Sequence, residues 1–510
     1  MLTRAAILLS LGSHLLLLGA EPTEWRCFGG DAGGVRFSPL TQITPRNVAQ
    51  LSRAWVYHTG EIAAGTASRN AGKIEPFETT PLVIGGVMYI TTASSRVIAL
   101  DPETGKEIWR FDPPIEPSRK RAAPNRGISY WESGNAKRIL YGTGSGHLVA
   151  FDARTGKLAP GFGREGMVDL RENFAEKWPP SAYAVTSPPV VYRDLVITGS
   201  RVPEGPGRGP SGAVRAFDIR TGKQAWVFHT VPQPGEPGHE TWEGDSWKDR
   251  TGVNVWSIMS IDAERGIVFL PVGSPAYDFY GGDRKGQNLY GNCLVALNAS
   301  TGKLLWYYQL VHHDVWDYDP PAQPTLVTVR RGGREIPAVA QVTKMGLVFV
   351  FDRVTGKPLL PIEERAAPMS DVPGEATWPT QPFPLAPPPI SRIAIERREL
   401  SKVTPESQRY CEELFDSTIT RGMFTPYGLK LTLVLPGTLG GATWSGGAFD
   451  SRTGYYFVNG NEQGAVGMMA EQPAGSPDRY RRTSKWGSYA RFTDPNGWPC
   501  VAPPWGTLNA

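Results

Sequence analysis

The stretch LVHHDVWDYDPPAQP, residues 310–324, gathers side chains that could carry out acid–base or metal chemistry. Carboxylates accept protons and bind hard cations, and imidazoles bind zinc. In an extended segment the adjacent His312 and His313 would point to opposite faces, which disfavours a zinc ion shared by the two. The stretch therefore indicates a catalytic loop or a cation-binding carboxylate, and an acidic turn closed by Trp316 is the alternative.

The composition is typical of a globular protein with many short strands and tight turns. Glycine and proline contribute 58 and 46 of the 510 residues, and 16 Trp, 18 Tyr and 19 Phe supply aromatic packing. A net charge of +4, with 20% charged residues, indicates neither a nucleic-acid-binding stripe nor an acidic tail. We therefore expect no nucleic-acid partner.

An internal repeat predicts the elements that must position the loop. The segment ALDPETGKEIWRFD has four counterparts, and the five copies occupy 99–112, 150–163, 216–229, 296–309 and 350–363. In each copy an apolar strand leads into a turn built on Asp or Asn with Thr-Gly, and a second strand follows. Strand-like segments at 81–84 and 87–92 complete a four-stranded unit in the first copy. The sequence thus predicts an all-β propeller, and a sandwich with similar hairpins is the alternative.

The first twenty residues have the pattern of a secretory signal peptide, in which Arg4 precedes an apolar run. We expect export to a periplasm, with an uncleaved membrane anchor as the alternative. The cysteines, at 27, 293, 411 and 500, form no C-x-x-C pair, so this sequence carries neither a c-type haem attachment motif nor a thiolate zinc site. Export permits a disulfide; we choose Cys411–Cys500, although sequence alone does not determine the pairing.

The longest insertion between the repeats spans residues 361–440. Its first part is rich in proline and should be extended. A short helix should follow, with Thr404 as its cap and Pro405 at its first position. Long loops on a rigid scaffold are where binding sites are commonly built.

Together with WRCFGGDAGGVRFSPLTQIT (25–44), HHDVWDYD and PGTLGGATWSGGAFD (436–450), the repeats resemble the quinoprotein dehydrogenases of the glucose, sugar and alcohol branch. The resemblance implies an eight-bladed propeller over residues 21–510 that uses pyrroloquinoline quinone (PQQ) and Ca²⁺. It also implies C-terminal truncation, with about the last two blades missing, so that a second chain could complete the ring. The segment with Trp55 would then be a strand without its partners.

The resemblance assigns roles to individual residues. Asp317 corresponds to the catalytic base, and Lys344 to the basic residue beside the quinone oxygens, where it would stabilise negative charge. Trp256 corresponds to the aromatic floor under the cofactor, for which a core tryptophan is the alternative. The remaining residues that match cofactor-binding positions are Glu78, Arg126 and Thr186.

Calcium needs oxygen ligands, and carboxylates suit it best. By resemblance Glu204, Ser274 and Asp317 are the metal ligands, and Ser274 ranks below the two carboxylates because the alcohol branch has an asparagine there. Asp314, Asp319 and the two histidines are expected to shape the loop. Trp131 stands where membrane glucose dehydrogenases have a histidine, which weighs against glucose as the substrate.

The function implied is that of a PQQ-dependent dehydrogenase, an oxidoreductase that acts on the CH–OH group of a sugar or alcohol. Electrons would pass to a membrane quinone or to a separate cytochrome. The protein would be periplasmic, with membrane association as an option. Two alternatives remain open, namely a cofactor-free propeller that serves as a scaffold for protein binding, and an inactive remnant of a dehydrogenase.

Overall fold

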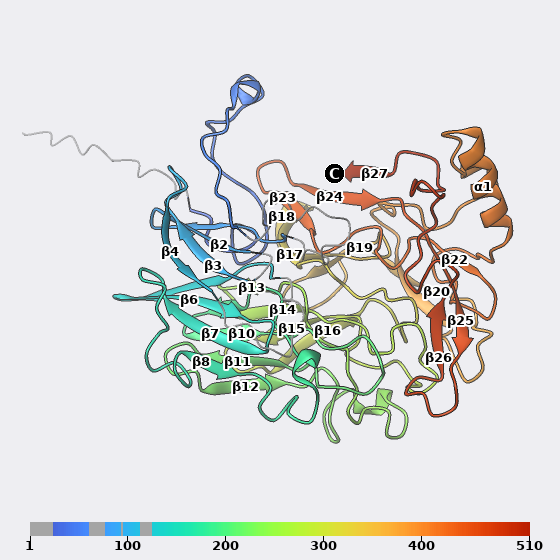
Figure 1. The fold of residues 1–510 in the computed structure, drawn as a ribbon, viewed down its shortest axis with the longest axis horizontal. Helices are drawn as coiled ribbons and strands as arrows, with labels where there is room; N and C mark the ends of the chain where they lie inside the picture. The colour runs from blue at the N-terminus through green and yellow to red at the C-terminus, as the bar shows by residue number, and fades with distance from the viewer. Residues whose placement is uncertain (1–23, 61–76, 93–94, 113–124) are drawn as a thin grey trace, which may run out of the picture.

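The fold is built from consecutive antiparallel sheets that follow one another along the chain (Figure 1). The computed structural model describes residues 24–60, 77–92, 95–112 and 125–510, so the expected signal peptide at 1–20 lies outside the described residues. Four sheets have four strands each. They comprise β1 (Leu82–Ile84), β2 (Val87–Thr91), β3 (Val97–Leu100) and β4 (Glu107–Phe111); β5 (Ser129–Ser133), β6 (Ala136–Gly142), β7 (His147–Asp152) and β8 (Met167–Asp169); β9 (Val190–Tyr192), β10 (Leu195–Thr198), β11 (Val214–Asp218) and β12 (Gln224–Phe228); and β13 (Ser260–Asp262), β14 (Ile267–Pro271), β15 (Cys293–Asn298) and β16 (Leu304–Gln309).

Smaller sheets follow in the second half of the chain. They are formed by β17 (Thr325–Arg331), β18 (Arg334–Val342) and β19 (Val348–Asp352); β20 (Ile362–Ala366) and β21 (Thr380–Pro384); β22 (Thr432–Val434), β25 (Ala465–Glu471) and β26 (Tyr480–Thr483); and β23 (Gly447–Asp450), β24 (Tyr455–Asn461) and β27 (Gly506–Asn509).

The first strands of successive sheets lie side by side. Strand β5 contacts β9, β9 contacts β13, β13 contacts β17, and β17 contacts β23. The sheets therefore radiate from a common line of inner strands, as the blades of a propeller do. This arrangement confirms the predicted all-β propeller class and the four strands predicted for the first copy of the repeat.

The turn between the third and fourth strands of a blade depends on local hydrogen bonds. In the first blade Asp101 Oδ1 accepts hydrogen bonds from the backbone N–H and the hydroxyl of Thr104, at 2.8 and 2.9 Å. Gly105 then adopts φ +70°, which a residue with a side chain rarely does. Asp152, Asp218, Asn298 and Asp352 accept equivalent bonds from the threonine three residues later.

Tryptophans of the outer strands connect neighbouring blades. Trp226, on β12, donates its indole N–H to the carbonyl of Ala299, 3.1 Å away, in the turn of the next blade. A Cβ on Gly302 would lie 2.6 Å from the Trp226 ring, so glycine makes the close approach possible. The same arrangement joins Trp109 to Ala153, Trp306 to Arg353, and Trp55 to Pro102.

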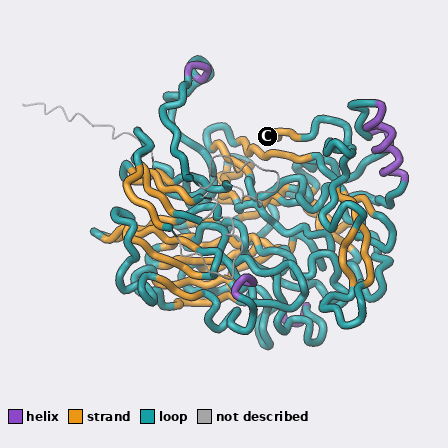
Figure 2. Tube along the Cα trace, in the orientation of Figure 1, coloured by secondary structure: helices purple, strands orange, loops and turns teal. Residues whose placement is uncertain are grey.

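The N-terminal segment differs from the expectation. Residues 51–59 form no strand, although Trp55 occupies the docking position of an outer-strand tryptophan on the β3–β4 turn. The neighbouring 3₁₀ turn η1 (Val48–Gln50) lies at the tip of a loop that projects from the sheets (Figure 2).

The insertion has the predicted elements. Its Pro-rich part forms the β20–β21 hairpin, and helix α1 (Pro405–Asp416) begins where Thr404 accepts a hydrogen bond from the backbone N–H of Ser407.

Cys411 and Cys500 form a disulfide, which confirms our choice of pair. Shorter 3₁₀ turns are η2 (Pro180–Ala182), η3 (His239–Thr241) and η4 (Arg397–Glu399). Within the described part of the chain, no helix has the length and apolar character needed to span a bilayer.

Candidate active site

A cavity of about 190 Å³ lies where the loops that precede the inner strands β9, β13 and β17 converge. Thr186 precedes β9 by four residues, Trp256 precedes β13 by four, and Asp319 precedes β17 by six. The lining residues are Arg126, Thr186, Arg201, Val202, Glu204, Gly252, Asn254, Trp256, Ser274, Asp278, Asp317 and Asp319.

Most of the predicted site residues therefore meet in one place. Six of them line the cavity, namely Arg126, Thr186, Glu204, Trp256, Ser274 and Asp317. The other two lie directly behind the lining, because Lys344 forms an ion pair with Asp317 and Glu78 forms one with Arg126.

A buried lysine holds the two aspartates of the opening stretch. Lys344 Nζ lies 2.8 Å from Asp317 Oδ1 and 2.5 Å from Asp319 Oδ1. Burial alone would lower the pKa of Lys344, but the two carboxylates outweigh it and raise the pKa, so this ammonium group stays charged. Asp319 also accepts a hydrogen bond from the indole N–H of Trp256. Asp319 is thus part of the site wall, whereas the sequence suggested only a loop-shaping role.

A buried arginine lies between aromatic rings on the other side of the cavity. The guanidinium carbon of Arg126 is 5.1 Å from the centre of the Trp256 ring and 5.5 Å from that of Trp444. Its Nη2 pairs with Glu78 Oε2 at 2.9 Å, and its backbone N–H donates to the carbonyl of Thr186. The result is a cationic, aromatic surface suited to a flat anionic molecule.

The cavity also concentrates carboxylates. Asp278 is 2% exposed, and its Oδ2 has no hydrogen-bond partner among the described residues. Burial, with the neighbouring charges of Asp317, Glu204 and Asp319, raises the pKa of Asp278 well above its usual value. Burial raises the pKa of Asp317 as well, and together with the charges of Asp319 and Glu204 it outweighs the opposing effect of Lys344.

The excess of negative charge could be balanced by a cation. Among the described residues, however, no three His, Cys, Asp or Glu side chains converge into a ready-made metal site. The hydroxyl of Ser274 already donates to Asp314 Oδ2, and Asn292 donates to both of these residues. Asp314 in turn accepts the backbone N–H groups of Trp316 and Tyr318, which confirms its predicted role in shaping the loop.

Residues 25–510 match the family described as the glucose/ethanol/alcohol dehydrogenase β-propeller domain, with the heading PQQ. The chain belongs to this family of PQQ-dependent dehydrogenase propellers. It is 32% identical to the quinate/shikimate dehydrogenase (quinone) of Acinetobacter baylyi, over 98% of this chain and 66% of that protein. It is also 32% identical to the quinoprotein glucose dehydrogenase of Escherichia coli, over 96% of this chain and 64% of that protein.

The structure supports the same assignment. The quinohemoprotein alcohol dehydrogenase ADHIIG of Pseudomonas putida superimposes with a TM-score of 0.65 at 27% identity, over 90% of this chain and 60% of that one. The chain therefore spans roughly two thirds or less of the length of these relatives.

The residues present fit the cofactor of the family. PQQ is a flat ortho-quinone with three carboxylates, and Arg126, Trp256 and Trp444 offer a charge and ring faces for such a molecule. The unpartnered oxygen of Asp278 and the surplus carboxylate charge fit a divalent cation beside it.

Several residues of the site did not follow from the sequence. Asp278 lies four residues after Ser274, Asn254 two residues before Trp256, and Arg201 three residues before Glu204, so each of them is close in sequence to a predicted site residue. Trp131, on β5, does not line the cavity; it is 4% exposed and belongs to an apolar cluster with Leu140 and Leu148.

Proposed function

We propose that the mature chain, residues 21–510 after removal of a signal peptide at 1–20, oxidises a hydroxyl group of a sugar or alcohol with PQQ and Ca²⁺. The observation that carries this proposal is the pairing of a buried Lys344 with Asp317 at the wall of a cavity that also presents Arg126 and Trp256. A protein-binding scaffold needs none of these buried charges, and their desolvation would be costly without a function.

The residues have complementary roles in this proposal. The bound quinone supplies the two-electron acceptor. Asp317 removes the proton of the substrate hydroxyl, and Lys344 keeps the Asp317 carboxylate in place and places a positive charge beside the reacting oxygens. Arg126 would neutralise a cofactor carboxylate, Glu78 and Thr186 orient that arginine, and Trp256 would offer a ring face to the cofactor.

Calcium would be held by Asp317 and Glu204, and we add Asp278 as a third carboxylate. Glu204 is exposed, and within the described residues its carboxylate accepts one long hydrogen bond, from the hydroxyl of Tyr489 at 3.4 Å, so it is free to turn toward a cation. Ser274 is a weaker candidate for a calcium ligand than these carboxylates, because its hydroxyl already donates to Asp314.

Electrons would leave for a membrane quinone or a separate cytochrome. The relative from Acinetobacter baylyi has quinone in its name, which favours the first of these. The Cys411–Cys500 disulfide supports an exported, periplasmic protein, because such bonds persist in oxidising compartments. A second chain could extend the propeller. The insertion at 361–440 contributes the β20–β21 hairpin, strand β22 and helix α1.

The experiment that tests the proposal is titration of the purified chain with PQQ, with and without Ca²⁺, followed by tryptophan fluorescence. Calcium-dependent quenching that is lost in Glu204→Ala supports the site, and a dye-linked assay with aldoses, polyols and primary alcohols then identifies the substrate class. Absence of quenching by a folded chain would contradict the proposal and favour a scaffold or an inactive remnant.

A further inference from the structure

A second buried ion pair lies behind the loop that carries Asp317. His313 precedes Asp317 by four residues, and the two have φ values of +46° and +61°. This left-handed region is unfavourable for residues other than glycine, so surrounding contacts must hold both residues there. The contacts of His313 therefore decide how the loop is held.

Both ring nitrogens of His313 face hydrogen-bond acceptors. Nδ1 lies 2.8 Å from the carbonyl oxygen of Gly286, and Nε2 lies 2.8 Å from Glu375 Oε1. A carbonyl cannot donate, and a neutral imidazole has only one N–H group. Both bonds can therefore form with an ionised Glu375 only if His313 carries two ring protons and a positive charge.

The surroundings keep Glu375 ionised. Burial would raise its pKa, but the bonds from His313 and the Gly281 N–H, together with the nearby charge of Arg284, lower it. The side chains of His313 and Glu375 are 0% and 2% exposed, so this pair is isolated from water. A charge-assisted bond in such a place is stronger than a neutral one.

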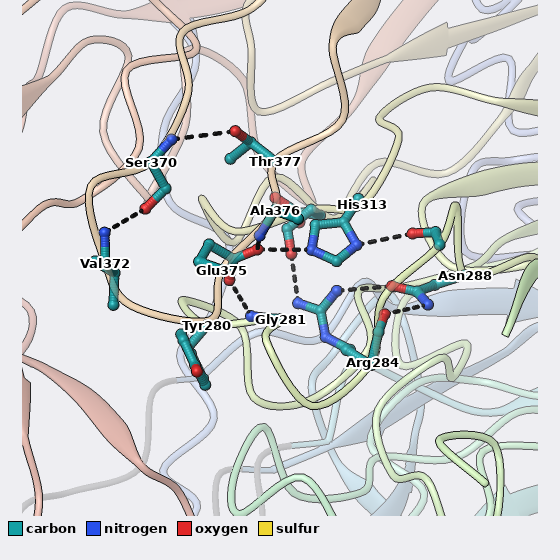
Figure 3. A network of polar contacts seen from close by, with 12 residues as sticks. Tyr280, Gly281, Arg284, Asn288, His313, Ser370, Val372, Glu375, Ala376 and Thr377 are labelled. Carbon is teal, nitrogen blue, oxygen red and sulfur yellow. Dashed lines mark hydrogen bonds and ion pairs between the residues drawn. The ribbon is translucent and has the colours of Figure 1, made fainter. Parts of the chain in front are cut away.

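The pair joins three separate parts of the chain (Figure 3). Glu375 belongs to the 361–440 insertion, Gly281 and Arg284 to the loop between β14 and β15, and His313 to the loop of Asp317. Arg284 is fully buried and donates to the carbonyl of Asp314 and to Asn288. In the described part of the chain no carboxylate lies within ion-pair distance of Arg284, so its charge adds to that of His313 around Glu375.

We propose that His313, held as an imidazolium between Glu375 and Gly286, is a positioning residue that fixes the loop presenting Asp317. Its catalytic consequence rests on the proposed function. Each ring nitrogen bonds a different segment of the chain, so a change that removes either bond should loosen the loop and lower turnover while the fold persists. The other charged or titratable groups that face the pair are Arg284 and Tyr280.

The test uses Glu375→Gln, which can replace the charged pair by a neutral one. The introduced amide can donate an N–H to an unprotonated Nε2 of His313, and its oxygen can accept from Gly281, while Nδ1–H still donates to Gly286. Because both bonds are kept in this form, Glu375→Gln should retain kcat of the PQQ-loaded protein to within about threefold, whereas Glu375→Ala, which removes the partner of Nε2, should lower kcat by about tenfold or more. His313→Gln should lower kcat by about tenfold or more, while KM changes by less than about threefold.

A matched control exists in the same loop. His312 pairs with Glu364 at 3.3 Å, but the Glu364 side chain is 48% exposed. Glu364→Ala should therefore leave kcat within about threefold of that of the original protein. An equal loss of kcat in Glu375→Ala and Glu364→Ala, or no loss in Glu375→Ala, would overturn the positioning role.

A second measurement needs neither cofactor nor activity. The chain has 7 histidines, so ¹⁵N-histidine labelling gives a readable imidazole spectrum, in which His313→Gln assigns the His313 signals. We expect His313 to show two protonated nitrogens, as its two acceptors require, and only one protonated nitrogen in Glu375→Gln. A neutral His313 in the unmodified chain would overturn the inference, whereas an imidazolium in a chain that fails to bind PQQ would refute only the proposed function.

Discussion

Lys344 Nζ contacts Asp317 twice, at 2.8 Å from the carboxylate Oδ1 and at 2.9 Å from the carbonyl oxygen of the same residue. One ammonium group thus fixes both the backbone and the side chain of a residue whose φ is +61°. The lysine follows the end of β18, in a different sheet from the strand that precedes Asp317. The site therefore depends on the packing of two blades against each other.

The first prediction concerns the proposed base. In Asp317→Asn the amide can still accept a hydrogen bond from Lys344, but it cannot take a proton from a substrate hydroxyl. We expect kcat to fall by about 10²–10⁴, the usual contribution of a general base, while PQQ still quenches tryptophan fluorescence. A variant with near-normal turnover in the dye-linked assay would show that another group removes the proton.

The second prediction concerns calcium and protons. Burial and neighbouring charges raise the pKa values of Asp278 and Asp317 in the calcium-free chain, and a cation bound beside them would lower both values. Binding should therefore release protons, and the affinity for Ca²⁺ should increase with pH. Calorimetric titration in two buffers with different ionisation enthalpies counts the protons released. Equal heats in the two buffers would contradict the expected linkage.

The third prediction concerns the stability of the calcium-free chain. Because the pKa of Asp278 is raised in the folded state, the folded chain binds more protons than the unfolded chain. Its stability should then decrease as the pH rises above about 4, the ordinary pKa of an aspartate. Asp278→Asn should remove the part of this decrease that Asp278 causes, while Asp317, whose pKa is also raised, keeps its own part. The variant should stabilise the calcium-free chain at high pH by about 1–3 kcal/mol, the cost of an unpaired buried polar group.

The comparison that checks this is thermal unfolding at about pH 5 and about pH 8, both above the ordinary aspartate pKa. Asp245→Asn is a suitable control, because the Asp245 side chain is 74% exposed. The stabilising effect should appear only for Asp278→Asn and should be larger at the higher pH. The same variant should lose the stabilisation that Ca²⁺ gives the original chain.

The sequence predicted the structural elements that depend on interactions between residues close in the chain. The Asp–Thr–Gly turns depend on hydrogen bonds between residues close in sequence, and the cap of α1 depends on the bond between Thr404 and Ser407. Short motifs therefore predicted both features. Asp317, Lys344, Arg126 and Trp256 followed from a family motif. The structure brings these four together at one cavity.

The rest depends on contacts between distant segments. Asp278 becomes part of the site only because the β14–β15 loop folds back over the cavity, and no periodicity in that loop marks it. The pairing of Asp319 with Lys344, and of His313 with Glu375 across 62 residues, likewise has no local signal.

The fourth prediction concerns the disulfide between α1 and the C-terminal segment. Cys411 and Cys500 enclose a separation of 89 residues, and both are buried in one apolar cluster. Cys411→Ser/Cys500→Ser should destabilise the chain by about 2–5 kcal/mol. Urea unfolding measures the change, and Cys27→Ser, which removes a free thiol, is the control. Equal stability of the two variants would mean that the bond does not form in the purified protein.

The fifth prediction concerns Trp226, the outer-strand tryptophan that packs on the turn of the next blade. Gly302 and Gly454 occupy equivalent turns with φ +70° and +78°, but only Gly302 has a docked ring, that of Trp226. Alanine costs about 1–2 kcal/mol at either position because of the left-handed backbone. Gly302→Ala should cost about 1–3 kcal/mol more, since its Cβ would lie 2.6 Å from the Trp226 ring, whereas a Cβ on Gly454 meets no atom within 4 Å. Urea unfolding of the two variants separates the clash from the backbone strain, and equal losses would show that the indole does not dock in solution.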